Sequence, residues 1–403
     1  MKIATTLLDD DDLIRLIYSR LDCVADRVQM RQVCRTWRSA LPPVQQQRCP
    51  PFLLVGGPGG PSFSCGTGGG GCSGNFHFMR VPEYARGARY FGAYPGGWLF
   101  LALKNRTEVS EYALVSLRTE QLIPVPDSFY FISDPASSRN AVITAATLSA
   151  TPQDPEGCYG AAICSRYPFP VGDFVSALWL VGVSSTAIGT QTSVKLEDVI
   201  WFEGAFHFLT LTENILVFRV PEFYRDNDGN AKRAPAERIL HFDAGGRDYG
   251  NNKVLRYLVE SRGKLLMVCR LIPVLPLMRM TTDFRVFEME ERPKQAINSE
   301  LLEERYAWNE LDSLDGRVLF VGRGCSKSFE VADYPNIKLQ DGVLFVDDGK
   351  LYCITGEGAI PLHHPCKDNQ VWLAAKKRVP GGVVNFLPER AASNCSPPTW
   401  FLP

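Results

Sequence analysis

Apolar and polar residues follow a helix-like spacing in the first 41 residues of this 403-residue chain and a strand-like spacing afterwards. Residues 1–41 contain no Gly or Pro, whereas both recur from Pro42 onward between short runs of Val, Leu, Ile, Phe and Tyr. The Pro42-Pro43 pair cannot continue a helix, because proline lacks the backbone N–H and clashes with the preceding turn. We therefore expect a small helical domain over residues 1–43 and a larger, mainly β domain over residues 44–403.

Residues 1–41 contain two stretches in which apolar residues recur at helical spacing, so that each stretch has one apolar face. Four aspartates, Asp9 to Asp12, precede the first stretch, at the end where unpaired N–H groups favour negative charge. At helical spacing this stretch carries Leu13, Leu16, Ile17 and Leu21. The second stretch runs from Cys23 to Leu41, and one arc of its helical wheel holds Met30, Val33, Cys34, Trp37, Ala40 and Leu41. Two or three short helices bury too little apolar surface to be stable alone, so we expect the rest of the chain or another protein to cover them.

Another arc of the second helical stretch is basic. It carries Arg27, Arg31, Arg35 and Arg38. A solvent-exposed face and a contact with an acidic protein both fit this pattern. Nucleic acid fits less well, because no aromatic residues for base stacking lie between the arginines.

After the helical segment, a Gly followed by an apolar run recurs along the chain. Short apolar runs often precede these glycines, which is typical of β-hairpins. The runs begin at Gly97, Gly204, Gly263, Gly316 and Gly349. With a weaker turn at Gly157 and Gly160, the glycines lie roughly 45–60 residues apart over most of the chain, which is the size of one β-propeller blade. We therefore predict a mainly β fold, with the helical domain followed by a six- or seven-bladed β-propeller.

The stretch 56–74 is rich in glycine and has few large apolar residues. Such a segment cannot bury enough apolar surface to offset the entropy cost of ordering it. We expect a flexible loop that leaves an early blade of the propeller.

Composition and charge argue against several classes of partner. The 43 basic and 44 acidic residues give a formal net charge of −1, which provides no general attraction to nucleic acid or to an anionic membrane. No apolar run approaches the roughly 20 residues that span a bilayer, and the N-terminus lacks the apolar core of a secretion signal. We expect an intracellular protein of the nucleus, the cytoplasm or both, with neither nucleic acid nor a membrane as partner.

No complete catalytic, cofactor-binding or metal-binding motif is recognisable. The twelve cysteines include no Cys-x-x-Cys pair, so we interpret them as thiols rather than as disulfides or metal ligands. The cluster His363-His364-Pro365-Cys366 could chelate a metal, yet no nearby carboxylate or cysteine pair completes a tetrahedral set. Gly322-Arg-Gly-Cys-Ser-Lys-Ser328 resembles a phosphate loop, but Ser326 replaces the glycine that must precede the lysine. We predict no cofactor, no metal and no catalytic residue, and interpret the 322–328 segment as a tight turn between blades.

Two parts of the chain resemble known domain families. Asp12-Leu-Ile-Arg-Leu-Ile17, Arg20-Leu21 and the closing Val33-Cys34-Arg35 with Trp37-Arg38 are similar to an F-box of the type common in plants. That family usually opens with Leu-Pro, where this chain has aspartates. The remainder resembles the kelch-like, KIB-type propeller domain that commonly follows such F-boxes. Its matching phrases include Gly96-Gly-Trp-Leu99, Asp198-Val-Ile-Trp-Phe-Glu-Gly204, Phe284-Arg-Val-Phe287, Gly322-Arg-Gly-Cys-Ser326 and Trp400-Phe-Leu-Pro403.

The resemblance implies the substrate-recognition subunit of an SCF-type (Skp–cullin–F-box) E3 ubiquitin ligase. The F-box would dock on a Skp-type adaptor linked to a cullin and a RING subunit, and the propeller would present a loop-built face to a protein substrate. The chain would act by proximity and would not itself be an enzyme. The residues expected to contact the adaptor or to shape that surface are Leu13, Leu16, Ile17, Leu21, Val33, Cys34 and Trp37, with Trp37 as the anchor.

Two other functions stay open at this point. The missing Leu-Pro opening favours a non-ligase binding protein, whose propeller masks a protein partner and whose F-box is degenerate. An enzyme built on the propeller would need polar residues gathered from many blades at the central channel, a convergence that one sequence cannot reveal.

Overall fold

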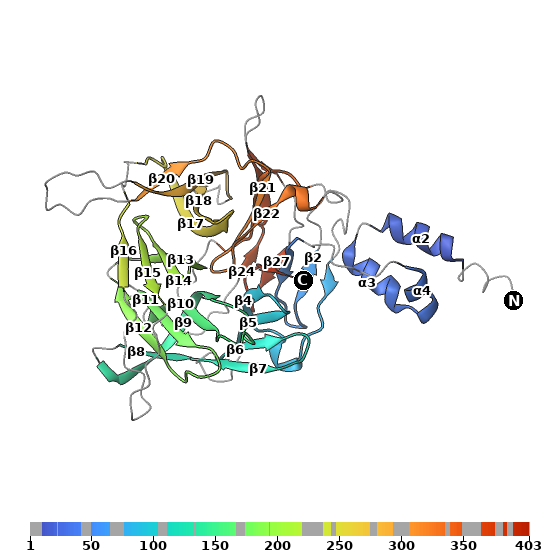
Figure 1. Ribbon diagram of the computed structural model, residues 1–403, viewed down its shortest axis with the longest axis horizontal. Coiled ribbons are helices and arrows are strands. Elements are labelled where there is room, and N and C mark those ends of the chain that lie inside the picture. The colour runs from blue at the N-terminus through green and yellow to red at the C-terminus, as the bar shows by residue number, and fades with distance from the viewer. Residues whose placement is uncertain are drawn as a thin grey trace.

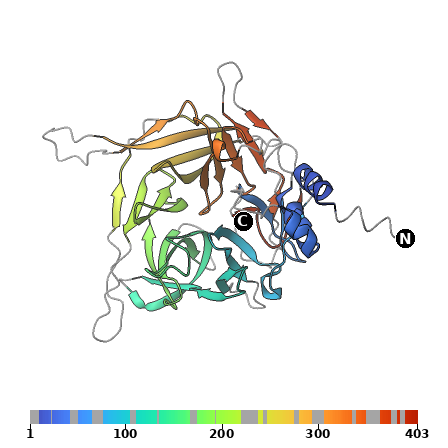
Figure 2. The same ribbon diagram turned by 45° about the vertical axis from the view of Figure 1, so that its right-hand side comes forward.

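A computed structural model describes most of the chain as an N-terminal helical segment beside a ring of β-sheets (Figures 1 and 2). Among the described residues, none of the helices is both long and apolar enough to cross a membrane. The described residues are 10–21, 23–41, 50–64, 76–103, 111–131, 134–166, 174–192, 194–219, 237–242, 247–274, 280–292, 306–334, 339–348, 364–374, 382–384 and 390–402.

Three short helices form the N-terminal segment. They are α2 (Asp11–Arg20), α3 (Val24–Gln32) and α4 (Arg35–Ala40). Asp10 begins α2, because its side chain accepts hydrogen bonds from the backbone N–H groups of Asp12 and Leu13. The three-helix arrangement expected of an F-box is confirmed, and a break after α3 divides the second predicted stretch into α3 and α4. At that break the sulfur of Cys34 accepts from the backbone N–H of Trp37 and begins α4.

The helical segment has its own small core. Ile14 on α2 is only 1% exposed, although it does not belong to the predicted stripe of that helix. The four buried core residues are Ile14, Met30, Ala40 and Leu41, and Tyr18, Leu21 and Trp37 pack against them. A core of this size is small, and the expectation that the rest of the chain or another protein covers the segment stays a prediction.

Two arginines of the basic arc, Arg27 and Arg31, make hydrogen bonds within the helical segment and are not simply exposed to solvent. The Arg27 Nε atom donates to the carbonyl oxygen of Leu21 at 2.6 Å, and an Arg31 guanidinium nitrogen donates to that of Leu41 at 2.7 Å. Both carbonyls lie just beyond the end of a helix, where no further turn is available to satisfy them. These two arginines therefore close the ends of α2 and α4.

Six blade-like sheets follow one another around the ring in the described residues (Figure 1). The predicted propeller is confirmed, with six blades. Blade 1 contains β28 (Thr399–Phe401), β1 (Phe52–Val55), β2 (Ser62–Ser64) and β3 (His77–Phe78). Blade 2 contains β4 (Arg89–Tyr94), β5 (Trp98–Leu103), β6 (Glu111–Ser116) and β7 (Leu122–Val125). Blade 3 contains β8 (Ser128–Phe131), β9 (Asp134–Leu148), β10 (Tyr159–Arg166), β11 (Phe174–Leu180) and β12 (Ala187–Thr192), and parallel pairing of β12 with β8 closes these strands into a small barrel.

The other three blades complete the ring, and a separate strand pair and two 3₁₀ turns accompany them. Blade 4 contains β13 (Leu196–Phe202), β14 (Ala205–Thr210), β15 (Ile215–Arg219) and β16 (Glu237–Leu240). Blade 5 contains β17 (Asn252–Ser261), β18 (Lys264–Pro273), β19 (Asp283–Glu291) and β20 (Tyr306–Glu310). Blade 6 contains β21 (Arg317–Val321), β22 (Lys327–Glu330), β23 (Gly342–Phe345), β25 (Gln370–Leu373) and β26 (Gly382–Val384). The remaining elements are β24 (His364–Cys366) paired with β27 (Arg390–Ser393), η1 (Glu83–Ala85) and η2 (Val331–Asp333).

Two-residue turns form two of the predicted hairpins. Glu203 and Gly204 join β13 to β14 with φ values of 45° and 73°, and Arg262 and Gly263 join β17 to β18 with 54° and 70°. Positive φ at both central positions is the type I′ geometry, which matches the twist of the flanking strands. Gly316 begins a strand as predicted, but the strand before it belongs to blade 5, so no hairpin forms there. The run that begins at Gly349 lies outside the described residues.

Strands from the two ends of the chain close the ring. The strand β28 pairs antiparallel with β1, so that Trp400 lies opposite Leu53. Trp400 is 2% exposed, its indole N–H donates to the carbonyl oxygen of Val321 at 2.8 Å, and its ring meets Phe320 edge-on. Blade 1 is thereby joined to blade 6, and the sheet edge that an open ring would expose is paired.

The glycine-rich stretch begins as a hairpin rather than a loop. The prediction of a loop over 56–74 is wrong for β2, whose residue Phe63 pairs with Leu54 and stacks on Phe52 at a centroid distance of 5.3 Å. The rest of the predicted loop, from residue 65 onward, lies outside the described residues.

His207 on β14 gives the propeller an acid-sensitive position. It is 6% exposed, its ring meets that of Phe202, and its Nδ1–H donates to the carbonyl oxygen of Ala205 at 3.3 Å. Burial lowers the pKa of His207 to about 4. Below about pH 6.5 the unfolded chain therefore binds a proton that the folded chain does not.

We predict that His207 destabilises the fold as the pH falls from about 6.5 to about 4. Its contribution to this loss is about 3 kcal/mol, since one pKa unit corresponds to roughly 1.4 kcal/mol. Urea unfolding of the wild type and of His207→Gln at several pH values in this range measures the effect, and the variant should show a flatter acid limb. His241→Gln, which changes a half-buried histidine, is the control and should keep the wild-type slope. Equal slopes for all three proteins would contradict the prediction.

Candidate protein-binding site

The helix α2 carries apolar side chains on two faces. Ile14 and Leu21 face inward, where they belong to or pack on the core of the helical segment. Leu16 and Ile17 face outward, with 49% and 42% of their surface exposed, and Leu13 is half-buried. At about 100° per residue, Leu13, Leu16 and Ile17 share an arc that does not include Ile14. The predicted stripe is thus divided, since Leu21 packs into the core and Leu16 and Ile17 point to solvent.

The break between α3 and α4 exposes a further apolar residue. Val33 is 62% exposed, and Cys34 beside it is exposed as well. Trp37, predicted to be the anchor of a protein contact, is half-buried and packs against the core of its own segment. Leu16, Ile17 and Val33 are called the exposed apolar set below. Because they lie on a segment with a small core of its own, these side chains are candidates for a contact with another protein.

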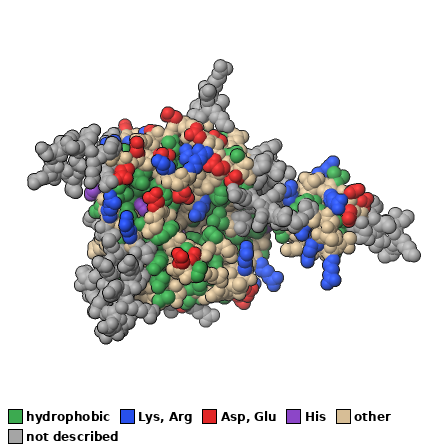
Figure 3. Space-filling model, viewed as in Figure 1, with side chains coloured by type: hydrophobic (Ala, Val, Ile, Leu, Met, Phe, Trp, Pro, Cys, Tyr) green, Lys and Arg blue, Asp and Glu red, His purple; other side chains and the backbone are tan. Residues whose placement is uncertain are grey.

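Charged side chains accompany this set. Figure 3 shows basic side chains at the surface of the helical segment, and both Arg35 and Arg38 are exposed. Arg15 lies within 3.8 Å of Asp11 and 3.6 Å of Asp12, in pairs whose members are all more than half exposed. Such exposed pairs contribute little to folding. Arg15 also donates from Nε to the carbonyl oxygen of Ala40 at 3.0 Å, so it connects α2 to the end of α4.

The loop 322–326 joins β21 to β22 and contacts four other blades. The backbone N–H of Gly324 donates to Asp198 on β13 at 2.7 Å, and a guanidinium N–H of Arg323 donates to the carbonyl oxygen of Glu197 at 2.5 Å. Towards blade 1, the sulfur of Cys325 lies 3.5 Å from the hydroxyl oxygen of Thr399. The prediction of a turn between blades is wrong, because the loop connects two strands of blade 6. It is called the central loop below.

Two glycines allow the close approach of the central loop to blades 2 and 3. A Cβ atom on Gly324, whose φ is +71°, would lie 2.2 Å from the carbonyl oxygen of Ala146 on β9. A Cβ atom on Gly92 of β4 would lie 2.9 Å from the Cβ of Cys325. No side chain fits at these distances, so both positions require glycine. The central loop therefore occupies the space that the inner strands surround.

The carboxylate of Asp198 holds three segments together. It accepts from the backbone N–H groups of Val199, Leu258 and Gly324, at 2.9, 2.8 and 2.7 Å. These groups belong to β13, to β17 and to the central loop. Burial raises the pKa of Asp198 to about 7, although the three N–H donors and the nearby Arg323 oppose the shift.

Other buried charges join blade 5 to blade 6. Arg270 on β18 is 1% exposed and donates to Asp368 at 2.7 Å and to Asp348 at 3.3 Å. Tyr257 donates to the same oxygen of Asp348 at 2.6 Å. Burial acts to lower the pKa of Arg270, but Tyr257 and the two carboxylates raise it, so the guanidinium stays charged. The geometry is that of a structural ion-pair network, in which each charge is satisfied by its neighbours.

The cluster His363–Cys366 has no metal-like arrangement in the part that the structure describes. His364 and Cys366 lie on β24 and are both buried. Cys366 belongs to an apolar core and accepts a hydrogen bond from the side chain of Asn369 at 3.1 Å. His363 lies outside the described residues.

We predict that Asp198→Asn destabilises the propeller by about 1–3 kcal/mol. The change replaces one acceptor oxygen with an NH₂ group, so a buried backbone N–H of Leu258 or Gly324 would face another donor. Asp154→Asn is the control, because that side chain accepts only in a local turn from Glu156 and asparagine can replace it there. Chemical denaturation of the three proteins measures the difference. Equal stability of wild type and Asp198→Asn would show that the carboxylate does not hold the blades.

Comparison with protein families assigns both parts of the chain. The F-box domain matches residues 10–42, and the KIB1-4 β-propeller matches residues 63–383. The second match leaves out β1 and β28, the strands that close the ring. The helical segment is therefore an F-box domain, and the ring is a propeller of known family.

Other comparisons add little. No curated protein matches the sequence. A protein from Bacteroides fragilis, assigned as a 6-phosphogluconolactonase, has 11% identity and a TM-score of 0.35 over 88% of this chain and 98% of its own. An exo-β-1,3-galactanase from Phanerochaete chrysosporium has 6% identity and a TM-score of 0.24 over 53% of this chain and 48% of its own. Similarity this low carries no inference about fold or function.

Proposed function

Because this chain belongs to the KIB1-4 β-propeller family and carries an F-box domain, we propose that it is the substrate-recognition subunit of an SCF-type E3 ubiquitin ligase. Its F-box binds a Skp-type adaptor, and through the adaptor a cullin and a RING subunit. Its propeller binds the protein substrate. Such a complex works inside the cell, in the nucleus, the cytoplasm or both.

The exposed apolar set is the observation that carries this proposal. Leu16, Ile17 and Val33 take no part in the core of the F-box, yet each exposes more than 40% of its surface. Burying aliphatic side chains against a partner gives roughly 25 cal/mol per Å² of apolar surface. The F-box therefore gains stability when a protein covers this set.

The F-box lacks the Leu-Pro pair with which the family usually begins, so its first helix must start in another way. Aspartates stand where the family has Leu-Pro, and proline starts a helix well because its φ is already fixed. Asp10 serves the same purpose by capping the N–H groups of Asp12 and Leu13. Asp10 thus starts α2 in place of the missing proline. The absence of Leu-Pro is therefore no reason to expect an unfolded first helix that could not bind the adaptor.

The propeller supports a substrate surface made of loops. The central loop takes up the space between the inner strands, and buried hydrogen bonds and ion pairs surround it. A substrate protein therefore binds the rim of the ring, where connections between strands are exposed. Ubiquitination follows from proximity, since holding an acceptor lysine near the charged conjugating enzyme raises its effective concentration. This role requires no catalytic residue in the chain.

Adaptor binding is the decisive experiment. We predict that the full chain, co-expressed with a Skp-type adaptor, forms a one-to-one complex, and that Leu16→Ala and Val33→Ala each weaken it by about tenfold, or roughly 1–2 kcal/mol. Val183→Ala in the propeller is the matched control, because Val183 and Val33 are 61% and 62% exposed. Calorimetry of wild type and variants measures the affinities.

Trp37→Ala is a harsher test of the same interface. We predict a loss of a few kcal/mol in adaptor binding, because a large aromatic anchor is removed. Part of this loss comes from the core on which Trp37 packs, so amide exchange of α2 and α3 is measured alongside. A folded wild type that never binds the adaptor would overturn the proposal and favour a binding protein outside any ligase, whose propeller masks its partner.

A further inference from the structure

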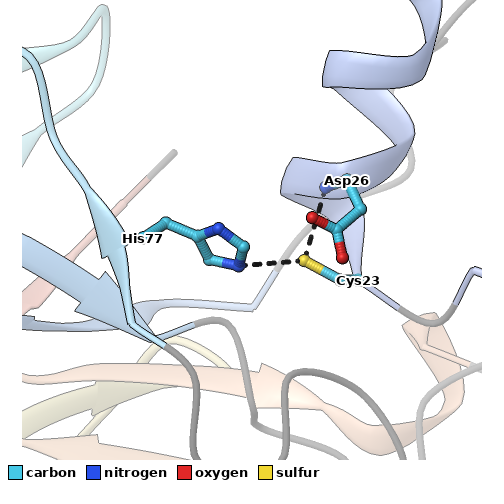
Figure 4. Close-up of side chains that lie close together, drawn as sticks. All are labelled: Cys23, Asp26 and His77. Atoms are coloured by element: carbon cyan, nitrogen blue, oxygen red, sulfur yellow. Dashed lines mark hydrogen bonds between the residues drawn. The ribbon is translucent and has the colours of Figure 1, made fainter.

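Three side chains with metal-binding atoms converge where the F-box meets blade 1 (Figure 4). Cys23 directly precedes α3 and is buried, Asp26 lies in the first turn of that helix, and His77 lies on β3. The Cys23 sulfur is 3.2 Å from His77 Nε2, and the three donor atoms lie within 4.8 Å of one another. In the sequence, Cys23 and His77 are 54 residues apart, so no spacing motif indicates this cluster.

The spacing of the donor atoms fits a tetrahedral zinc ion. Zinc binds sulfur at about 2.3 Å and histidine nitrogen at about 2.0–2.1 Å, which places the two donors about 3.5 Å apart at a tetrahedral angle. The observed 3.2 Å needs a shift of a few tenths of an ångström, within the reach of side-chain rotation. A carboxylate oxygen of Asp26 points to the same place in Figure 4. Water completes the fourth position, as it does at zinc sites with three protein ligands.

The donor set selects the class of metal. One thiolate, one imidazole and one carboxylate form a mixed set that suits zinc, whereas magnesium and calcium take oxygen donors. The thiolate and the carboxylate carry two negative charges, which balance a divalent cation in a partly buried site.

Local structure holds the three ligands in place. The Cys23 sulfur accepts from the backbone N–H of Asp26 at 3.4 Å, so the start of α3 fixes both side chains on one side of the helix. His77 pairs with Phe63 across β2 and β3, and their rings lie 5.3 Å apart. Each half of the cluster is therefore positioned by its own domain.

We propose that Cys23, Asp26 and His77 form a zinc site that joins the F-box to the propeller. The expectation of no metal is revised on this geometry. A zinc ion bound by both domains restricts their relative orientation, and in a ligase that orientation sets where the substrate stands. Metal binding itself rests on the three ligands and not on the adaptor, so it is tested separately from the proposed function.

Metal content of the full chain, purified without a polyhistidine tag, tests the site. We expect about one zinc ion per chain after dialysis, and less than a fifth of that in Cys23→Ser, Asp26→Asn and His77→Gln. Cys395→Ser and His241→Gln are the matched controls, because they change a half-buried cysteine and a half-buried histidine elsewhere and should retain the metal. Cobalt added to the metal-stripped wild type should give a thiolate-to-cobalt charge-transfer band that Cys23→Ser lacks.

Amide exchange separates a structural zinc from a simple hydrogen bond. Removing the metal with a chelator should increase exchange in α3 and β3 of the wild type, and should change nothing further in His77→Gln. A wild type that holds no zinc and takes up no cobalt overturns the proposal and leaves the Cys23–His77 contact as a hydrogen bond. Retention of zinc by both Cys23→Ser and His77→Gln overturns it as well, because the metal would then lie elsewhere.

Discussion

The three hydrogen bonds accepted by Asp198 are the constraint on which the rest of the propeller depends. Buried apolar clusters pack neighbouring blades together, and Asp198 adds directional hydrogen bonds to that packing. Asp198 connects β13, β17 and the central loop through backbone N–H groups. The central loop then reaches blades 1, 2 and 3, and so carries this constraint across the ring.

The F-box depends on a different balance. Its core has four buried residues, and the exposed apolar set lies outside it. A core that also took in this set would leave less apolar surface for a partner protein. Hydrogen bonds of Arg27 and Arg31 with carbonyl oxygens stabilise the helix ends without using any of that surface.

Sequence patterns predicted the elements well and their long-range contacts poorly. Gly204 and Gly263 mark hairpins because a type I′ turn is a local event that needs glycine at a known place. The division of α2 into two apolar faces was not visible, since Ile14 and Leu16 look alike in a hydropathy pattern and only packing distinguishes them. Asp198 and the Cys23–His77 contact join residues distant in sequence, and a single sequence carries no signal for such pairs.

Closure of blade 1 by β28 has a consequence for how the protein is made. During synthesis the F-box emerges before the propeller, while the innermost strand of blade 1 is added only when residues 399–401 leave the ribosome. Until then β1 has an open edge, and the ring has no fixed circumference. A premature stop codon before residue 399 would therefore leave the F-box domain intact and the ring of the propeller open.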